Sequence, residues 1–206
     1  MKIAIIGSGN VGKALTKSLQ AAGHDVVVAS AHPDHAAELA DQLGATAEQA
    51  TVDAVRNTEI VVLAVPFAAA GREVAEEIRP AAHGKIVIDV TNPVSRELKL
   101  VTNGTSAAEE FQRWLPNARV VKAFNTLFAS RQEDPDAGGA ELDGFVAGDD
   151  ADAKQKVMDL VTSLGMRPID AGDLSVARIL EGMALLNMKV QIAHGWSWRS
   201  AWKLVD

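Results

Sequence analysis

The chain has 206 residues, of which 48% are hydrophobic and 23% charged, a composition typical of one folded domain with a modest extension. Its net charge of −7 disfavours nucleic-acid binding, and the absence of cysteine excludes disulfides, thiol nucleophiles and thiolate metal sites. No apolar run reaches the roughly 18 to 20 residues of a membrane helix, and Met1 leads straight into a strand rather than a secretory signal, so we expect no membrane partner and a cytoplasmic location.

The first expected strand, 3–6, runs directly into a glycine-rich turn and a helix start. Gly7, Gly9 and Gly12 stand in the G-x-G-x-x-G order of dinucleotide-binding folds: the first permits a tight turn, the second admits a pyrophosphate, and the third lets helix and strand pack closely. The helix N-terminus then offers N–H groups to phosphates. The alternative is a glycine turn that merely packs. The residues predicted here to bind the cofactor are Gly7, Ser8, Gly9, Asn10, Val11 and Gly12.

The end of the second expected strand, 25–29, is where such folds meet the adenosine ribose. An Asp or Glu there indicates NAD, because it binds the 2′-hydroxyl. This chain carries Ser30, Ala31 and His32 instead, with no carboxylate at the strand end. We therefore predict that NADP is favoured and NAD remains possible, with Ser30 and His32 binding the 2′-phosphate.

The rest of the chain alternates helices and strands, which predicts an α/β fold with a Rossmann-type, doubly wound parallel sheet. We assign residues 1–172 to the nucleotide-binding domain and 173–206 to a small helical C-terminal segment of the same compact unit. The polar stretch 131–142 reads as a loop. The expected helices are 35–43, 71–79, 107–114, 151–164 and 174–195, with a short amphipathic helix at 196–204; the expected strands are 59–64, 85–89, 119–123, 144–147 and 166–169.

Three of these strands end in small, polar or proline-containing turns. In an open α/β sheet, ligands bind at the carboxyl ends of the strands, so the three turns are expected at the edge that faces the nicotinamide half of a cofactor. Any one of them could be only a compact strand-to-helix turn, but their shared position favours a site. The residues predicted there are Val65, Pro66, Phe67, Asn92, Pro93, Ala123 and Asn125.

Other side chains give weaker signals. The five histidines lack the spacing of a zinc motif, so no metal site is expected, and no catalytic acid–base pair stands out. Trp196, Trp198 and Trp202 predict a docking face near the C-terminus. We expect this tail and the long helix to dock on a second subunit, giving a homodimer or higher homo-oligomer and closing the pocket. The rival arrangement has the tail folded back on its own sheet.

Taken together, these segments make the chain resemble the NADP-dependent oxidoreductases that use the deazaflavin coenzyme F-420. The supporting stretches are GSGNVG at 7–12, DVTNP at 89–93, VVKAFNT at 120–126, VAGDD at 146–150 and GMRPIDAGDLSVARILEGMALL at 165–186. Similar sequence occurs in the cytosolic domain of six-transmembrane metalloreductases.

The resemblance implies direct hydride transfer between NADP(H) and a small-molecule redox partner, coenzyme F-420 or a flavin, with little acid–base assistance. Members of the family commonly carry arginine after the serine of the second strand end, where this chain has Ala31. Two other functions stay open. One is a small-substrate dehydrogenase or imine reductase, with Lys189 as catalytic lysine; the other is a nonenzymatic NADP-sensing module.

Overall fold

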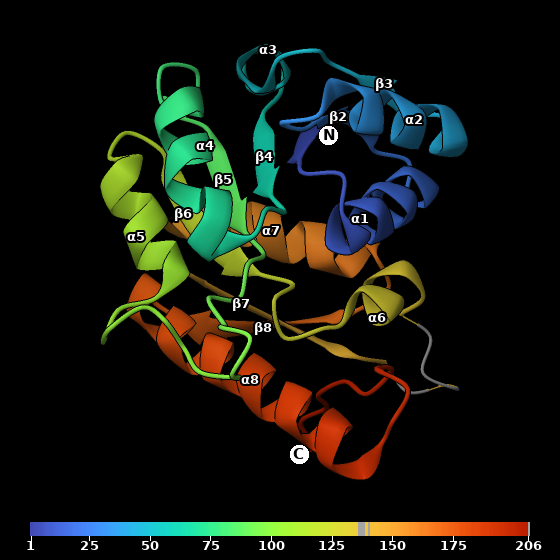
Figure 1. Ribbon diagram of the computed structural model, residues 1–206, viewed down its shortest axis with the longest axis vertical. Helices are drawn as coiled ribbons and strands as arrows, with labels where there is room; N and C mark the ends of the chain where they lie inside the picture. The colour runs from blue at the N-terminus through green and yellow to red at the C-terminus, as the bar shows by residue number, and fades with distance from the viewer. Residues whose placement is uncertain (136–138, 140, 206) are drawn as a thin grey trace.

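The computed structural model describes residues 1–135, 139 and 141–205, and its centre is a single twisted sheet (Figure 1). In this part of the chain the sheet has eight strands in the order β3-β2-β1-β4-β5-β6-β7-β8. The strands are β1 (Lys2–Ile6), β2 (Asp25–Ala29), β3 (Thr46–Ala47), β4 (Ile60–Leu63), β5 (Ile86–Asp89), β6 (Arg119–Ala123), β7 (Asp143–Gly148) and β8 (Arg167–Gly172).

Helices cover both faces of this sheet, which confirms the α/β Rossmann-type prediction. They are α1 (Asn10–Ala21), α2 (Pro33–Leu43), α3 (Thr51–Arg56), α4 (Arg72–Ile78), α5 (Ala107–Trp114), α6 (Ala129–Glu133), α7 (Ala151–Ser163) and α8 (Ala177–His194), with a π-helical turn η1 (Phe67–Gly71) and a 3-10 turn η2 (Leu174–Val176).

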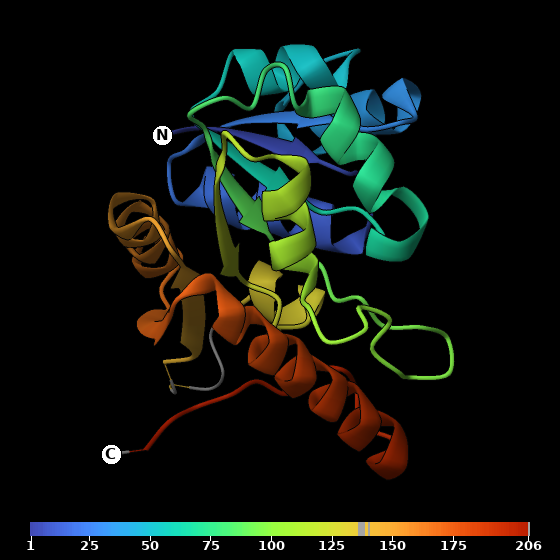
Figure 2. The same cartoon turned by 90° about the vertical axis from the view of Figure 1, so that its left-hand side faces the viewer.

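The strands bury both faces because their side chains alternate between two hydrophobic clusters. Ile3 and Ile5 point to the side that α1, α2 and α7 cover, whereas Ala4 and Ile6 point to the side that α3, α4 and α5 cover. A third cluster, formed by Phe145 and its neighbours, lies between β7 and α8. In Figure 2, α8 runs diagonally across the lower part of the view and its C-terminal end projects from the body of the domain.

The sheet is parallel, as predicted, except at one pair of strands. β7 runs antiparallel to β6, with Lys122 opposite Ala147. A parallel return needs a crossover that carries the chain back across the sheet, usually in a helix. Between β6 and β7 the described chain forms only the five-residue α6, so the chain re-enters the sheet from the edge at which β6 ended.

Several element boundaries also differ from the sequence-based expectation. α6 occupies 129–133, where part of the polar loop 131–142 was expected, while residues 136–138 and 140 of that loop lie outside the described residues. β3 and α3 were not predicted, because each is too short to show a clear period. The helix expected at 71–79 begins with the π-helical turn η1, and the long C-terminal helix begins with η2.

The tail is not the amphipathic helix expected at 196–204. Gly195 takes a left-handed conformation with φ of 62° and ends α8, and no helix follows in residues 196–205. The tail instead bonds to β7 and β8 of its own chain: the Asp143 N–H donates to the Trp202 carbonyl (3.2 Å), and the Arg167 guanidinium donates to the Leu204 carbonyl (2.6 Å). Trp202 packs into the third cluster, as in the folded-back arrangement, whereas Trp196 and Trp198 remain 52% and 44% exposed.

Candidate functional site

The glycine-rich turn after β1 has the geometry that its sequence predicts. Gly7 has φ of 122°, a conformation that L side chains rarely adopt, and a Cβ there would lie 2.3 Å from the Ala64 carbonyl oxygen. A Cβ at Gly12 would lie 2.0 Å from the Gly7 carbonyl oxygen, so α1 packs directly on the turn. At Gly9 a Cβ would meet nothing within 4 Å. The first and third glycines therefore serve packing, and the second faces open space.

That open space is a cavity of about 610 Å³ at the carboxyl edge of β1, β2, β4 and β5, which we call the edge cavity. It lies beside the point where the strand order reverses, between β1 and β4, the usual ligand position in such sheets. Most of the predicted residues line it: Gly7, Ser8, Gly9, Asn10, Val11, Ser30, His32, Val65, Pro66 and Asn92. The wall residues that the sequence reading did not name as site residues are Ile6, Ala31, Ala64, Ala70, Val74, Val90 and Thr91.

Five predicted residues lie off the cavity wall. Gly12 is buried beneath Gly7, and Ala123 is fully buried in the core between the sheet and its helices. Pro93 is buried behind the β5 turn. Phe67 turns away from the edge cavity and stacks on Trp114 with ring centroids 5.7 Å apart, in a neighbouring hollow. Asn125 stands behind Asn92 and acts through it.

Asn92 and Asn125 exchange two hydrogen bonds across the ends of β5 and β6. The Asn92 Nδ2 donates to the Asn125 carbonyl oxygen (2.9 Å), and the Asn125 Nδ2 donates to the Asn92 Oδ1 (3.0 Å). Phe124, just before Asn125, is buried and has φ of 63°, a costly conformation for a bulky residue that is found mostly at functional sites. The strained backbone at Phe124 thus places Asn125 next to Asn92, behind the cavity wall.

At the opposite end of the cavity, Ser30 and His32 form the turn between β2 and α2. The Ser30 hydroxyl donates to the His32 carbonyl (2.6 Å) and accepts from the His32 N–H (3.2 Å), so its proton is used inside the turn. The His32 ring lies 5.2 Å from the His35 ring, measured between centroids. Both imidazoles are exposed, and His32 lines the edge cavity.

Behind the Thr91–Asn92 part of the cavity wall lies a buried charged cluster that the sequence analysis did not predict. Lys122, Asp89 and Glu181, which we call the Lys122 cluster, have fully buried side chains, and the Lys122 Nζ lies 2.8 Å from both the Asp89 Oδ2 and the Glu181 Oε1. Burial raises the pKa of Glu181 to about 7, with the Asp89 charge adding to the rise and the Lys122 charge opposing it. The sequence does contain a signal for this cluster, because VVKAF and IVIDV each place a charged residue inside an apolar strand.

The edge cavity suits a dinucleotide. The N-terminus of α1 reaches it at Gly9 without a side-chain cap, so the first N–H groups of that helix are free to bind a pyrophosphate. The Thr91 Oγ1 and the Asn125 Oδ1 are buried and have no hydrogen-bond partner in the described part of the chain. Buried polar atoms are normally paired, and because Thr91 lines the cavity, a bound carboxamide would supply a partner for its hydroxyl.

Three further observations concern catalysis, metal binding and membrane insertion. Lys189, the candidate catalytic lysine, is exposed on α8 and is not among the residues that line the edge cavity. Over residues 1–135, 139 and 141–205, no group of three His, Cys, Asp or Glu side chains could hold a metal ion. None of the helices described is both long and apolar enough to cross a bilayer.

Comparison with known proteins agrees with this geometry. Residues 2–93 match the family model described as NADP oxidoreductase coenzyme F-420-dependent. A crystal structure of a candidate F-420-dependent NADP-reductase from Arthrobacter sp. is 30% identical, covers all of both chains and superimposes with a TM-score of 0.84. An imine reductase from Myxococcus stipitatus in complex with NADP+ is 20% identical with a TM-score of 0.74, covering 95% of this chain and 63% of that one, which shows a shared fold.

Among curated proteins, the rat metalloreductase STEAP3 is 32% identical over 188 residues, and human STEAP2 is 30% identical over 187. Each alignment covers 89% of this chain but only 36% of the relative. The chain thus spans about a third of the length of these metalloreductases.

Proposed function

The chain belongs to the family of coenzyme F-420-dependent NADP oxidoreductases, and from this premise we propose that it transfers a hydride between NADP(H) and a deazaflavin or flavin acceptor. The observation that carries the proposal is the edge cavity, into which the uncapped N-terminus of α1 opens at one place and the turn of Thr91 and Asn92 at another. When bound, the reduced nicotinamide supplies the hydride, and the acceptor also takes one proton from solvent while the nicotinamide becomes the oxidised cation.

Different residues of the cavity would bind different parts of the cofactor. Ser8, Gly9 and Asn10 would hold the pyrophosphate through backbone N–H groups at the start of α1. Ser30 and His32 would meet the ribose and its 2′-phosphate, while Val65, Pro66 and Asn92 would bound the nicotinamide end. The apolar side chains of Val65 and Val90 exclude water there, which protects a hydride donor from side reactions.

Among the described residues, those that line the nicotinamide end of the cavity include no general acid or base. The wall there consists of aliphatic, hydroxyl and amide side chains, and the carboxylates of Asp89 and Glu181 are fully buried and paired with Lys122. This favours an acceptor that takes a hydride directly, as a flavin or deazaflavin ring does, over substrates that need protonation by the enzyme.

The test is to mix the purified chain with NADPH or NADH and follow the loss of absorbance of the reduced nicotinamide. Separate reactions contain coenzyme F-420, FMN, FAD or a cyclic imine. We expect NADPH oxidation with the deazaflavin or a flavin and none with the imine. Turnover of the imine alone would favour the small-substrate reductase, and binding of NADPH without turnover of any acceptor would favour the sensing module.

We also propose that two copies associate through α8. Ile179 and Leu186, two turns apart on one face of this helix, are 63% and 52% exposed, and Trp196 beyond its end is 52% exposed. Large apolar side chains gathered on one surface usually mark an interface, and two-fold dimers are the commonest assemblies. Because Trp202 packs on its own chain, the contact would involve α8 and Trp196 rather than the whole tail.

A further inference from the structure

The Lys122 ammonium has all three of its donors engaged inside the protein. Its Nζ donates to the Asp89 Oδ2 (2.8 Å), the Glu181 Oε1 (2.8 Å) and the Thr91 carbonyl oxygen (2.6 Å). Replacement of a buried ion cluster by well-packed apolar side chains of similar volume is often neutral or stabilising, so such a cluster is weak evidence for a role in stability. Its presence behind the cavity wall therefore points to a role other than stability.

Strand register explains how the Lys122 cluster forms hydrogen bonds with Thr91 in the cavity wall. Asp89 and Lys122 are direct neighbours in the parallel pair β5–β6, so their side chains leave the sheet on the same face. The Asp89 Oδ1 accepts from the Thr91 N–H (2.8 Å), while Lys122 donates to the Thr91 carbonyl. Both backbone polar groups of Thr91 are thus held by this one pair.

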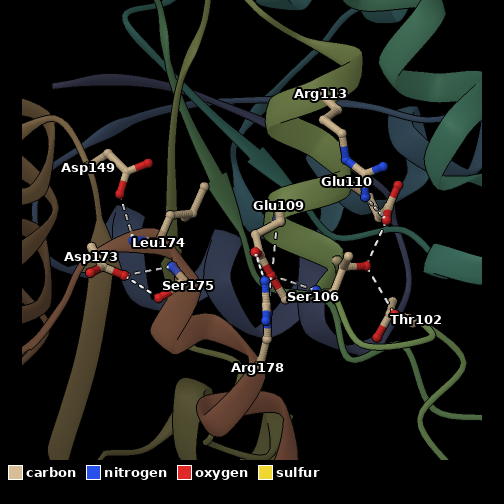
Figure 3. A network of polar contacts seen from close by, with 12 residues as sticks. Thr102, Ser106, Glu109, Glu110, Arg113, Asp149, Asp173, Leu174, Ser175 and Arg178 are labelled. Carbon is tan, nitrogen blue, oxygen red and sulfur yellow. Dashed lines mark hydrogen bonds and ion pairs between the residues drawn. The ribbon is translucent and has the colours of Figure 1, made fainter.

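Glu181 brings α8 into the same arrangement. Its Oε1 also accepts from the Ala107 N–H (2.8 Å) at the start of α5. One turn earlier on α8, Arg178 pairs with Glu109, whose carboxylate also completes the capping box with Ser106 (Figure 3). Two contacts from neighbouring turns of α8 therefore fix the helix against the N-terminus of α5 and set Glu181 on Lys122.

The held turn forms the nicotinamide end of the edge cavity. Thr91 and Asn92 line the cavity, and Asn92 is locked to Asn125 by their paired hydrogen bonds. Two of the buried side-chain oxygens that have no hydrogen-bond partner in the described chain, the Thr91 Oγ1 and the Asn125 Oδ1, belong to this assembly, and a third, the Glu181 Oε2, belongs to the Lys122 cluster. A shift of Thr91 would move Asn92 as well, since the two residues are adjacent in the chain.

We propose that Lys122 is a positioning residue that ties the Thr91–Asn92 turn to α8 through Glu181 and thereby sets the nicotinamide end of the cofactor site. The inference rests on the proposed function, since it needs an NADP-binding cavity. It separates the two halves of the cofactor: Lys122 acts on the nicotinamide end and leaves the end at Ser30 and His32 untouched.

The experiment measures dissociation constants for NADPH and for 2′,5′-ADP, which carries the adenosine half without nicotinamide. For Lys122→Met we expect NADPH binding to weaken about tenfold, the loss of roughly one well-placed hydrogen bond, with 2′,5′-ADP binding within about twofold of the wild type. The matched control is Arg167→Met, which breaks another ion pair to a buried acid, Asp143, on β7 and β8; it should change neither constant.

A folded Lys122→Met protein that binds NADPH like the wild type, or that loses both ligands equally, would overturn the proposal. If this variant does not fold, Glu181→Leu replaces it, because Lys122 then keeps Asp89 as its counter-ion. Glu181→Leu should weaken NADPH binding several-fold and leave 2′,5′-ADP binding unchanged. Glu181→Gln should bind NADPH like the wild type, because its amide oxygen can still accept from Lys122 and Ala107. Wild-type protein that binds neither ligand would instead overturn the proposed function itself.

Discussion

Gly12 stands so close to Gly7 that a Cβ at position 12 would lie 2.0 Å from the Gly7 carbonyl oxygen. Gly9, between them, has no atom within 4 Å of the place where its Cβ would be. The three glycines of one motif thus divide into two that the fold requires and one that leaves room for a ligand.

This division predicts opposite outcomes for two substitutions. Gly9→Val should fold with a loss of at most about 1 kcal/mol, the cost of a poor helix N-cap, and should abolish NADPH binding because its branched side chain occupies the space of the pyrophosphate. Gly12→Ala should destabilise the protein by about 3 kcal/mol through overlap with the Gly7 backbone. Calorimetry with NADPH and urea unfolding measure the two effects. Unchanged NADPH affinity in folded Gly9→Val would place the pyrophosphate elsewhere.

A second prediction concerns the choice between NADP and NAD. Ser30→Asp should make the protein prefer NADH over NADPH, with a change of about tenfold or more in the ratio of the two dissociation constants. The reason is that a carboxylate repels the 2′-phosphate and accepts from a ribose hydroxyl. The control is Ser30→Ala, which removes the hydroxyl that bonds to His32 without adding charge, and so should weaken NADPH binding without reversing the preference. The ratio of dissociation constants for NADPH and NADH is the measurement. A wild type that already prefers NADH would refute the assignment.

Much of this site could be predicted because its parts are local in sequence. The segment 3–12 contains a strand, a tight turn and a helix start within ten residues, and the turns at Val65 and Asn92 follow apolar strands whose ends meet at one edge of the sheet. Val65 and Asn92 lie on the cavity wall, whereas Ala123 and Asn125, predicted from the end of the next strand, lie off it.

The parts that could not be predicted depend on contacts between distant segments. Glu181 meets Lys122 across 59 residues, and although both lie in stretches that carry the family resemblance, no local pattern indicates that the two side chains pair. The tail was expected to be helical from its amphipathic pattern, but Arg167 and Asp143 bind its backbone and hold it along the sheet instead. Local periodicity carries no information about such partners, so tertiary contacts decide the conformation.

The proposed dimer gives a third prediction. Leu186→Glu places a charge in the exposed apolar face of α8 and should yield a monomer, whereas Lys189→Glu, a charge change at another exposed position of the same helix, should leave assembly intact. Light scattering would then report twice the 21.8 kDa chain mass for the wild type and for Lys189→Glu. Truncation after Gly195 is a poorer test, because it also removes Trp202 from the third cluster. A wild type that stays monomeric at high concentration would dismiss the interface.

The last prediction uses the titration of Glu181. Because burial raises the pKa of this carboxyl from 4.5 to about 7, the folded chain keeps a proton there that the unfolded chain has already released. The unfolded state therefore binds fewer protons between these two values, and the free energy of unfolding falls as pH rises through that window, by about 3 kcal/mol in all. Below pH 4.5 the carboxyl is protonated in both states, so the free energy of unfolding suffers no loss from Glu181. Above pH 7 it is ionised in both states, so the loss does not grow further.

Glu181→Gln removes this titration and keeps an oxygen that can accept from Lys122, so the variant should gain stability relative to the wild type as pH rises from 5 to 8. Urea unfolding of both proteins at one-unit steps of pH measures the difference, in which the other titrating groups cancel. Glu97→Gln changes an exposed carboxyl whose pKa is lowered by a hydrogen bond with Ser95, so this variant should run parallel to the wild-type curve over this range. A constant difference between wild type and Glu181→Gln across this range would mean that Glu181 stays ionised, and that Lys122 outweighs the burial of its carboxylate.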